Sequence, residues 1–362
     1  MQMESSKTFK DKKIALFALT PNSLAYAKKL KACFKNALLY PPDKLKSGGL
    51  RLLAKKTFKN CDALIFFSAT GIAVRVVAPL LGAKNIDPAV VVVDDLARFA
   101  ISLVSGHLGG ANALAGEVAA IIGAVPVITT ATDSRFLPCV EEIAAKTSSV
   151  IEDVKKIKVI NSAILNGSAI FIIDRNRKRL SALKKTFGVG KGKVLFHFAK
   201  KLPARPSDSA VFVVITSSAD YPVQRTLKTR TLMLRPREFS VGIGCKKGVS
   251  VKEVEKAVKA AFRVHGLSTL SIRNFATIDI KKTEQGILDY ATKARLSIEF
   301  YGVAELNTKK PPSGVSQAAL KNTGAFAVAE PSALLSSGAK RLWFKKIRTR
   351  NITLAAAKAS FR

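Results

Sequence analysis

Residues 98–133, RFAISLVSGHLGGANALAGEVAAIIGAVPVITTATD, decide the fold that this sequence predicts. The apolar runs at 99–104 and 125–129 have the length of buried strands, and a glycine-rich turn follows the first of them. Between the two runs, apolar side chains mark one helix face with the spacing i, i+4, i+7, i+8, at Leu114, Val118, Ile121 and Ile122. A strand, a turn, a helix and a strand in this order are typical of a parallel α/β sheet.

The same alternation reaches back to the start of the chain. Apolar runs predict further strands at 14–19, 63–67 and 89–93, and a helix that begins near Gly71 is ended or kinked at Pro79. We therefore predict an α/β protein whose residues 1–137 form an N-terminal domain with a parallel sheet of the Rossmann-like or flavodoxin-like type.

The rest of the chain divides into an irregular middle and a second regular part. In residues 138–238 we expect strands at 169–173 and 211–215, and a basic, proline-containing linker at 221–238. Residues 239–362 predict a smaller C-terminal α/β domain in which Ser250 caps the first helix. Its expected strands are 240–244, 274–280, 297–301, 341–347 and 351–357, and its expected helices begin near 251 and 283.

The charge balance is the most unusual property of the composition. The chain has 60 Lys and Arg against 25 Asp and Glu, a formal net charge of +35. The basic excess is spread over all three segments, and no zinc finger, basic zipper or RNP-type motif accompanies it, so we predict no specific nucleic-acid site. A basic nucleic-acid-binding protein stays the main alternative, while the positive field also suits a small polycarboxylate.

Membrane and metal signals are weak in this sequence. No apolar run approaches the roughly 18 residues of a membrane span, and the run at 14–19 fits a buried first strand better than a secretory signal. The cysteines show no ligand spacing to one another or to a histidine, and they favour reduced, mostly buried thiols among Cys33, Cys61, Cys139 and Cys245. We expect a cytoplasmic protein with no membrane association and no metal site.

Small and hydroxyl-bearing residues follow three predicted strands, as SATG at 68–71, SGHLGGAN at 105–112 and TTATD at 129–133. Because ligands of open α/β sheets lie beyond the carboxyl ends of the strands, we expect the three turns at one sheet edge. At least two of them run into helix starts, which favour carboxylate or phosphate groups, and Arg75 could add a charged donor. Taken singly, such glycines equally serve tight packing. There is no P-loop and no GxSxG motif.

Several segments in this order resemble the cobalt-precorrin-5A hydrolases of the oxygen-independent cobalamin pathway. The resemblance is densest over residues 63–133, clear again over 239–330 and thin over 138–238. Besides residues 98–133, it rests on SATGIAVRVVAPLL at 68–81, NIDPAVVVVDD at 85–95, VGIGCKKG at 241–248, FATIDIKKTEQGIL at 275–288, AELNT at 304–308 and PPSGV at 311–315.

The resemblance implies a hydrolysis. Enzymes of this family open the ring-A acetate lactone of an anionic cobalt-tetrapyrrole, cobalt-precorrin-5A, and release acetaldehyde to give cobalt-precorrin-5B. The cobalt comes with the substrate, so no cofactor is expected, and neighbouring methyltransferases of the pathway are candidate partners. A non-catalytic tetrapyrrole binder is a second alternative, and the oligomeric state is left open.

The candidate site residues combine the turns with the family motifs. We expect His107 to act as general base or acid near the lactone, with Asp133 as a second candidate base or as the group that orients the histidine. Backbone N–H groups around Gly109 and Gly110 would hold the oxyanion or a carboxylate. The substrate-binding candidates of the first domain are Thr70, Gly71, Arg75, Ser105, Gly106, Gly109, Gly110, Asn112, Thr130 and Thr132. Those of the C-terminal domain, equally typical of turns and caps, are Gly242, Gly244, Lys246, Thr277, Asp279 and Glu284.

Overall fold

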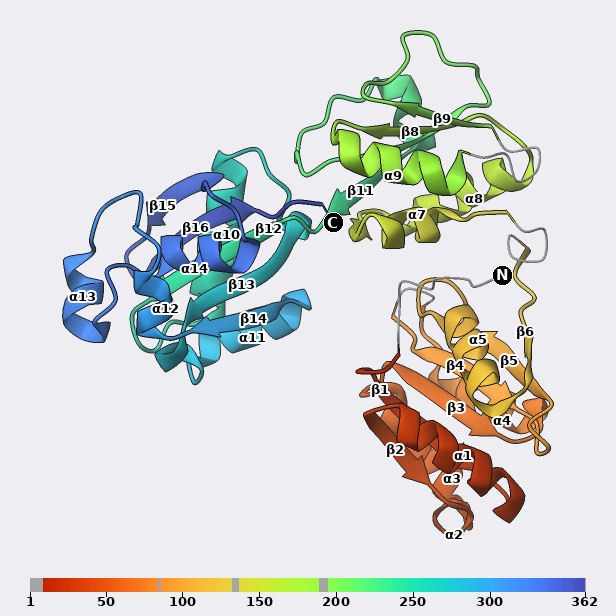
Figure 1. Cartoon of the computed structure of the whole chain (residues 1–362). Coiled ribbons are helices and arrows are strands. Elements are labelled where there is room, and N and C mark those ends of the chain that lie inside the picture. The colour runs from red at the N-terminus through yellow and green to blue at the C-terminus, as the bar shows by residue number, and fades with distance from the viewer. Residues whose placement is uncertain (1–8, 84–85, 132–136, 189–194, 362) are drawn as a thin grey trace. The chain divides into compact units, whose positions relative to one another are not determined.

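The computed structural model describes residues 9–83, 86–131, 137–188 and 195–361 (Figure 1). Internal contacts divide the chain into two compact units, Met1–Glu142 and Ile143–Arg362. The predicted fold class is confirmed, because the sheets are rich in parallel strands that alternate with helices along the chain. The three-part division at residues 137 and 238 stays a prediction.

The N-terminal unit is built on a six-stranded sheet in the order β2-β1-β3-β4-β5-β6. Five of these strands were predicted, and the sixth, β2, has a half-exposed pattern without a continuous apolar run. The ALIFF and AVVVV strands are buried throughout, as expected for central parallel strands covered on both faces. The strands are β1 (Lys13–Ala18), β2 (Asn36–Tyr40), β3 (Ala63–Phe67), β4 (Ala89–Val93), β5 (Phe99–Val104) and β6 (Val125–Val127).

Helices cover both faces of this sheet because successive side chains of a strand point to opposite sides. Leu16 of β1 belongs to the core under α1 and α5, whereas Phe17 belongs to the core under α3 and α4. The helix expected near Gly71 is confirmed as α4, and a 3-10 turn carries Pro79 directly after it. The helices are α1 (Pro21–Cys33), α2 (Pro42–Leu45), α3 (Gly49–Phe58), α4 (Thr70–Val77) and α5 (Ala111–Ile122), with the 3-10 turn at Ala78–Leu80. Helix α7 (Val140–Lys146) spans the boundary between the two units and is not part of these layers.

One pair of strands departs from the parallel pattern. β4 and β5 run antiparallel, with Val92 opposite Ile101, whereas β3 with β4 and β5 with β6 are parallel pairs. Only residues 94–98 join β4 to β5, and a parallel crossover needs about a dozen residues or more. The carboxyl ends of β5 and β6 therefore lie at the opposite sheet edge from those of β1, β3 and β4.

The second unit contains two five-stranded sheets, of which the first has the order β7-β11-β10-β8-β9. Its strands are parallel except for β7, which pairs antiparallel with β11. The expected strands at 169–173 and 211–215 are present as β8 and β10. The elements are β7 (Ser149–Ile151), β8 (Ile170–Asp174), β9 (Phe196–Ala199), β10 (Val211–Ile215), β11 (Thr231–Pro236), α8 (Ile157–Leu165) and α9 (Arg177–Phe187), with 3-10 turns at Val154–Lys156 and Arg225–Arg230.

The basic stretch predicted as a linker at 221–238 is not one. Its second half is strand β11, in which Leu232 and Leu234 are fully buried. Arg235 is 3% exposed and makes a bidentate pair with Glu152, at 3.0 and 2.8 Å from its Nη2. Prolines and basic residues suggested a solvated segment, but the arginine is ion-paired and the apolar residues alternate at strand spacing.

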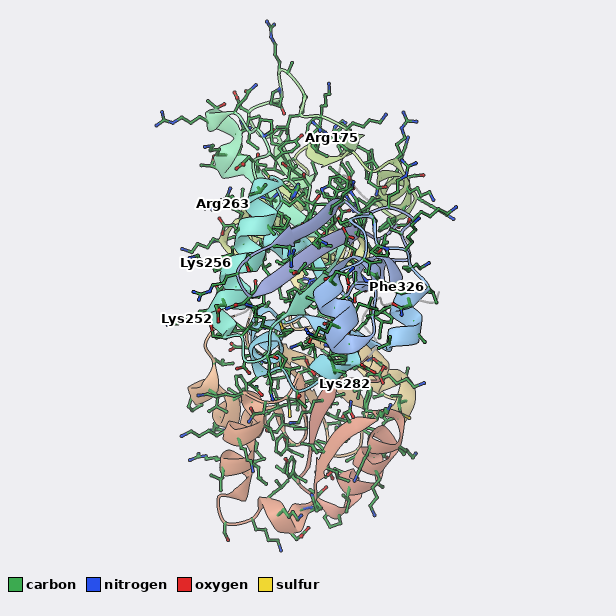
Figure 2. The ribbon with its side chains drawn as sticks, turned by 90° about the vertical axis from the view of Figure 1, so that its left-hand side faces the viewer. Arg175, Lys252, Lys256, Arg263, Lys282 and Phe326 are labelled. Carbon is green, nitrogen blue, oxygen red and sulfur yellow. The ribbon has the colours of Figure 1, made fainter. Side chains whose placement is uncertain are left out.

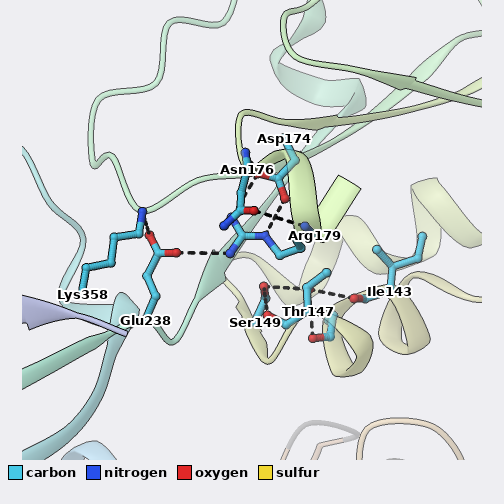
Figure 3. Close-up of polar contacts among 9 residues, drawn as sticks. Ile143, Thr147, Ser149, Asp174, Asn176, Arg179, Glu238 and Lys358 are labelled. Atoms are coloured by element: carbon cyan, nitrogen blue, oxygen red, sulfur yellow. Dashed lines mark hydrogen bonds and ion pairs between the residues drawn. The ribbon is translucent and has the colours of Figure 1, made fainter. Parts of the chain in front are cut away.

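A buried charge cluster joins the first sheet of this unit to the second (Figure 3). Arg179 of α9 lies between two carboxylates, with Nη2 at 3.0 Å from Asp174 and Nη1 at 3.2 Å from Glu238. Glu238 also pairs with Lys358 at 2.8 Å. Burial raises the pKa of Asp174, although the hydrogen bonds from Arg179 act in the opposite direction. Each charge of this cluster therefore has a partner of opposite sign, which offsets the cost of burying it.

The second sheet of this unit has the order β14-β13-β12-β16-β15. Ser250 caps α10 as predicted, and Lys252, Lys256 and Arg263 lie on the exposed side of this helix (Figure 2). α10 and α11 cover one face of the sheet, and α14 packs on the other. The strands are β12 (Phe239–Cys245), β13 (Ile272–Ile278), β14 (Ser297–Tyr301), β15 (Phe344–Arg348) and β16 (Ile352–Lys358). The helices are α10 (Val251–Val264), α11 (Gln285–Ala294), α12 (Val303–Asn307), α13 (Gln317–Thr323) and α14 (Ala329–Ser337), with 3-10 turns at Thr269–Ser271 and Asp279–Lys281.

Candidate active site

The glycine-rich turn 105–112 and Thr130 lie at one edge of the N-terminal sheet. β5 runs into the turn and β6 ends shortly before Thr130, and the two strands are parallel neighbours. The side-chain amide of Asn112 donates to Oγ1 of Thr130 at 3.0 Å, so the two segments are joined directly. The expectation that these two turns share an edge is therefore confirmed for the residues up to 131.

The SATG turn does not belong to this group, and the expectation of one shared edge is wrong for it. It follows β3, whose carboxyl end is at the opposite edge because β4 and β5 are antiparallel. Thr70, Gly71 and Arg75 therefore cannot join the turn that carries His107. The guanidinium of Arg75 is exposed and donates to the carbonyl of Gly71 at 3.2 Å, within its own helix.

Two left-handed residues shape the turn 105–112. Ser105 has φ of 60° and Gly110 has φ of 91°. This geometry lets the carbonyl of Ser105 accept from the N–H of Ala111 at 3.1 Å, and that of Gly106 accept from the N–H of Asn112 at 3.0 Å. The turn thus supplies acceptors for the first N–H groups of α5, which would otherwise lack partners. Because the N–H groups of Ala111 and Asn112 are already paired, only other backbone N–H groups of the turn can bind an anion here.

The glycines of the turn are required by close contacts. A Cβ on Gly109 would lie 2.4 Å from Cβ of Ser105, and one on Gly106 would lie 2.7 Å from Oδ1 of Asn112. Real Cβ atoms do not approach other atoms so closely, so packing alone accounts for both glycines. Half-buried positions at 105–109 still leave this backbone partly open to solvent.

Asn112 links three segments of the site through its side-chain amide. It is 9% exposed, and its Oδ1 accepts from Oγ of Ser102 at 2.6 Å while its amide holds Thr130. These bonds use both ends of the side-chain amide. Its hydrogen bonds connect α5 with β5 and with the segment after β6. Its role as a substrate ligand stays a prediction.

His107 lies against a buried thiol. Its Nδ1 is 3.5 Å from Sγ of Cys139, and Cys139 is fully buried just before α7. Burial, followed by the charges of Glu141 and Glu142, raises the pKa of this thiol far above its usual range, so it stays protonated. No local pattern in the sequence signals this partner, because Cys139 follows His107 by 32 positions in another part of the fold. Thr132 and Asp133 lie outside the described residues.

Two C-terminal candidates are packing positions. A Cβ on Gly242 would lie 1.7 Å from the carbonyl oxygen of Ala329, so α14 can approach β12 only over a glycine. Thr277 is fully buried, and its hydroxyl donates to the carbonyl of Ile243 at 2.6 Å. Both residues hold elements of the second unit together. Gly244 differs, since its Cβ would make only an ordinary 3.6 Å contact with Val328.

The other C-terminal candidates lie where β12 and β13 end. Glu284 is 8% exposed, accepts from the N–H of Gly248 at 2.9 Å and pairs with Lys281 at 3.0 Å. Its carboxylate therefore fixes the turn after β12. Lys246 is exposed and Asp279 half-buried at the same edge, which follows from the parallel pairing of β12 with β13. These two side chains are the better placed of the set to meet a ligand.

Family models match the two parts of the chain that carry the sequence motifs. Residues 53–133 match Cobalamin synthesis G N-terminal, and residues 239–357 match Cobalamin synthesis G C-terminus. The chain belongs to the cobalamin synthesis G family. The resemblance recognised in the motifs is thereby confirmed.

Relatives of this cobalamin synthesis G chain match it over nearly the whole length. It is 30% identical to the cobalt-precorrin-5A hydrolase of Priestia megaterium, over 95% of this chain and 94% of that protein. It is 30% identical to the cobalt-precorrin-5A hydrolase of Salmonella typhimurium, over 96% and 98%. The match to the crystal structure of a cobalamin biosynthesis protein G homolog from Sulfolobus solfataricus covers 96% of this chain and 97% of the homolog, with 23% identity and a TM-score of 0.38. The protein is an enzyme of the hydrolase class, as its curated relatives are.

The described residues contain neither a candidate membrane-spanning helix nor a candidate metal-binding cluster. None of the described helices is long and apolar enough to cross a bilayer. Within the same part of the chain, no three His, Cys, Asp or Glu side chains gather in a group that could hold a metal ion.

Proposed function

We propose that this protein hydrolyses the ring-A acetate lactone of cobalt-precorrin-5A and releases acetaldehyde, giving cobalt-precorrin-5B. The single observation that carries the proposal is the membership of the chain in the cobalamin synthesis G family, together with curated relatives named for this substrate at 30% identity. The cobalt belongs to the substrate, and we propose no further cofactor.

The turn 105–112 supports this chemistry. In lactone hydrolysis the oxygen of water bonds to the carbonyl carbon, the bond from that carbon to the ring oxygen breaks, and a water proton ends on the released hydroxyl. Acetaldehyde leaves when this hydroxyl oxygen becomes the aldehyde oxygen and the bond from its carbon to the macrocycle breaks, so that the bonding electron pair and the hydroxyl proton pass to the macrocycle. The hydrolysis needs a group that moves a proton and donors for the oxyanion. We propose His107 for the first task and the backbone around Gly109 and Gly110 for the second, because both belong to one half-buried turn at a sheet edge.

The anionic rim of the substrate suits the charge of the protein. A corrin precursor carries several carboxylates, and a net charge of +35 attracts them from a distance. Lys246 and Asp279, at the carboxyl edge of the C-terminal sheet, are proposed as substrate contacts, while Gly242 and Thr277 serve packing.

The test is an anaerobic incubation of the purified chain with the cobalt-precorrin-5A lactone. We expect acetaldehyde in the supernatant and a pigment whose mass changes by the gain of one water and the loss of one acetaldehyde. Binding without acetaldehyde would instead make the protein a tetrapyrrole carrier. Nucleic-acid affinity that survives moderate salt would favour the basic-protein alternative.

The role of His107 is tested with a matched histidine. His107→Gln should bind the pigment but lower acetaldehyde release by about 100-fold or more, since acid–base catalysis typically contributes this much. His197→Gln changes an exposed histidine that stacks on Phe171 in β8, and it should keep full activity. Undiminished release by His107→Gln would remove His107 from the mechanism.

A further inference from the structure

A short polar chain leads from α7 to His107. Sγ of Cys139 is 3.5 Å from Nδ1 of the half-buried imidazole, and Glu141, two positions further along the chain, lies close enough to this thiol to raise its pKa. Cys139 itself is 0% exposed, so water does not compete for its sulfur. The two elements that meet at this sulfur are the turn after β5 and the start of α7 (Val140–Lys146).

The thiol has one proton to give and lone pairs to offer. Burial and the neighbouring Glu141 and Glu142 raise the pKa of Cys139, so the sulfur keeps its proton at neutral pH. Glu141 is the stronger acceptor, since a carboxylate accepts better than a neutral imidazole, and it therefore takes the S–H. The sulfur lone pairs are then left for an N–H at Nδ1 of His107. A thiol that donates to a carboxylate is polarised and becomes a better acceptor.

We propose that Cys139 is a positioning residue that accepts a hydrogen bond from Nδ1–H of His107 and so leaves Nε2 as the unprotonated nitrogen. The arrangement fixes both the tautomer and the ring orientation, as the partner of a catalytic histidine does in other enzymes. Its catalytic consequence rests on the proposed function, because Nε2 would be the atom that takes a proton from the attacking water. Cys139 does not act as a nucleophile, since its protonated sulfur is buried.

The first test reads the tautomer directly and needs no substrate. The chain has 3 histidines, so the ring nitrogens of His107 can be assigned in ¹⁵N NMR by their loss in His107→Gln. We expect wild-type His107 to carry its proton on Nδ1. Cys139→Ala should move the proton to Nε2, whereas Cys139→Ser, which keeps an acceptor, should retain it on Nδ1. Cys61→Ala removes another buried thiol, in the core under α3 and α4, and should leave the His107 signals unchanged.

The second test uses the lactone assay. Cys139→Ala should lower kcat by about tenfold with little change in KM, and Cys139→Ser should restore most of it. An Nε2–H tautomer in the wild type, or identical His107 signals in wild type and Cys139→Ala, would overturn the proposal even if Cys139→Ala folds poorly, because the wild-type spectrum decides it. If acetaldehyde is never formed, the proposed function fails while the NMR result still decides the pairing of Cys139 with His107.

Discussion

The side-chain amide of Asn112 joins Thr130 to Ser102, with 3.0 Å from its Nδ2 to Oγ1 of Thr130. This places Ser102 of β5, Asn112 after β5 and Thr130 after β6 in one hydrogen-bonded group. The shape of the turn that carries His107 therefore depends on a side chain that makes these bonds beneath it.

Removal of this amide should loosen the site. Asn112→Ala leaves two hydroxyls without these partners, so we expect the free energy of unfolding to fall by about 1–3 kcal/mol. Urea denaturation measures the change. Asn60→Ala, which removes an exposed amide that bonds the carbonyl of Lys56 at 2.8 Å, is the control and should have almost no effect. Equal effects of the two substitutions would contradict the role of Asn112.

Replacing Gly109 or Gly116 by alanine should change the stability of the protein in opposite directions. Gly109→Ala places a Cβ 2.4 Å from that of Ser105 and should destabilise the protein by about 1–3 kcal/mol. Gly116→Ala, in the middle of α5, meets nothing within 4 Å and should stabilise it by about 0.5–1 kcal/mol. Thermal unfolding of the two variants gives the comparison, and a stabilising Gly109→Ala would show that the turn is less tight than described.

A second glycine pair separates packing from binding in the C-terminal sheet. Gly242→Ala would drive a Cβ to 1.7 Å from the carbonyl oxygen of Ala329, and we expect a loss of about 3 kcal/mol. Gly244→Ala makes an ordinary 3.6 Å contact and should change stability by less than about 0.5 kcal/mol. Chemical denaturation followed at Trp343 reports on this sheet, because the indole packs 5.5 Å from the ring of Phe239.

The buried charge cluster around Arg179 should be costly to break. Arg179→Met leaves Asp174 and Glu238 without their shared partner, and removal of one member of a buried pair typically costs about 3–5 kcal/mol. Arg175→Met changes an exposed arginine four positions earlier and should be nearly neutral. Denaturant midpoints of the two variants are compared with the wild type. Similar midpoints for both variants would mean that the cluster contributes little to the free energy of unfolding.

The cap of α10 predicts a response to acid. The backbone N–H of Ser250, then the amide of Asn351, lower the pKa of Glu253 from 4.5 to about 2. Because the folded pKa lies below the unfolded one, the contribution of this carboxylate is present above about pH 4.5 and is lost as the pH falls toward 2. The Tm of Glu253→Gln, which retains a capping side chain, should therefore fall less between those pH values than that of the wild type. An equal fall in both proteins would contradict the assignment.

Local sequence patterns determined most of the elements of this protein. Continuous apolar runs such as ALIFF and AVVVV predicted buried strands, the apolar spacing of α5 predicted a helix with its covered face, and the Ser250 cap predicted the start of α10. Family motifs pointed to the turn 105–112. What the sequence predicted poorly was β11, because its alternating leucines stand among prolines and arginines that are buried and paired only in the folded chain.

Strand direction and long-range contacts were decided by the tertiary structure. The short connection at 94–98 turns β5 back along β4, which moves the SATG turn to the other sheet edge and leaves His107 with Thr130 rather than Arg75. Cys139 reaches His107 only because α7 starts beside the turn, a contact between residues 32 positions apart. Periodicity reports how a segment is buried, whereas the partner of a side chain depends on how distant segments pack, and only the folded chain contains that information.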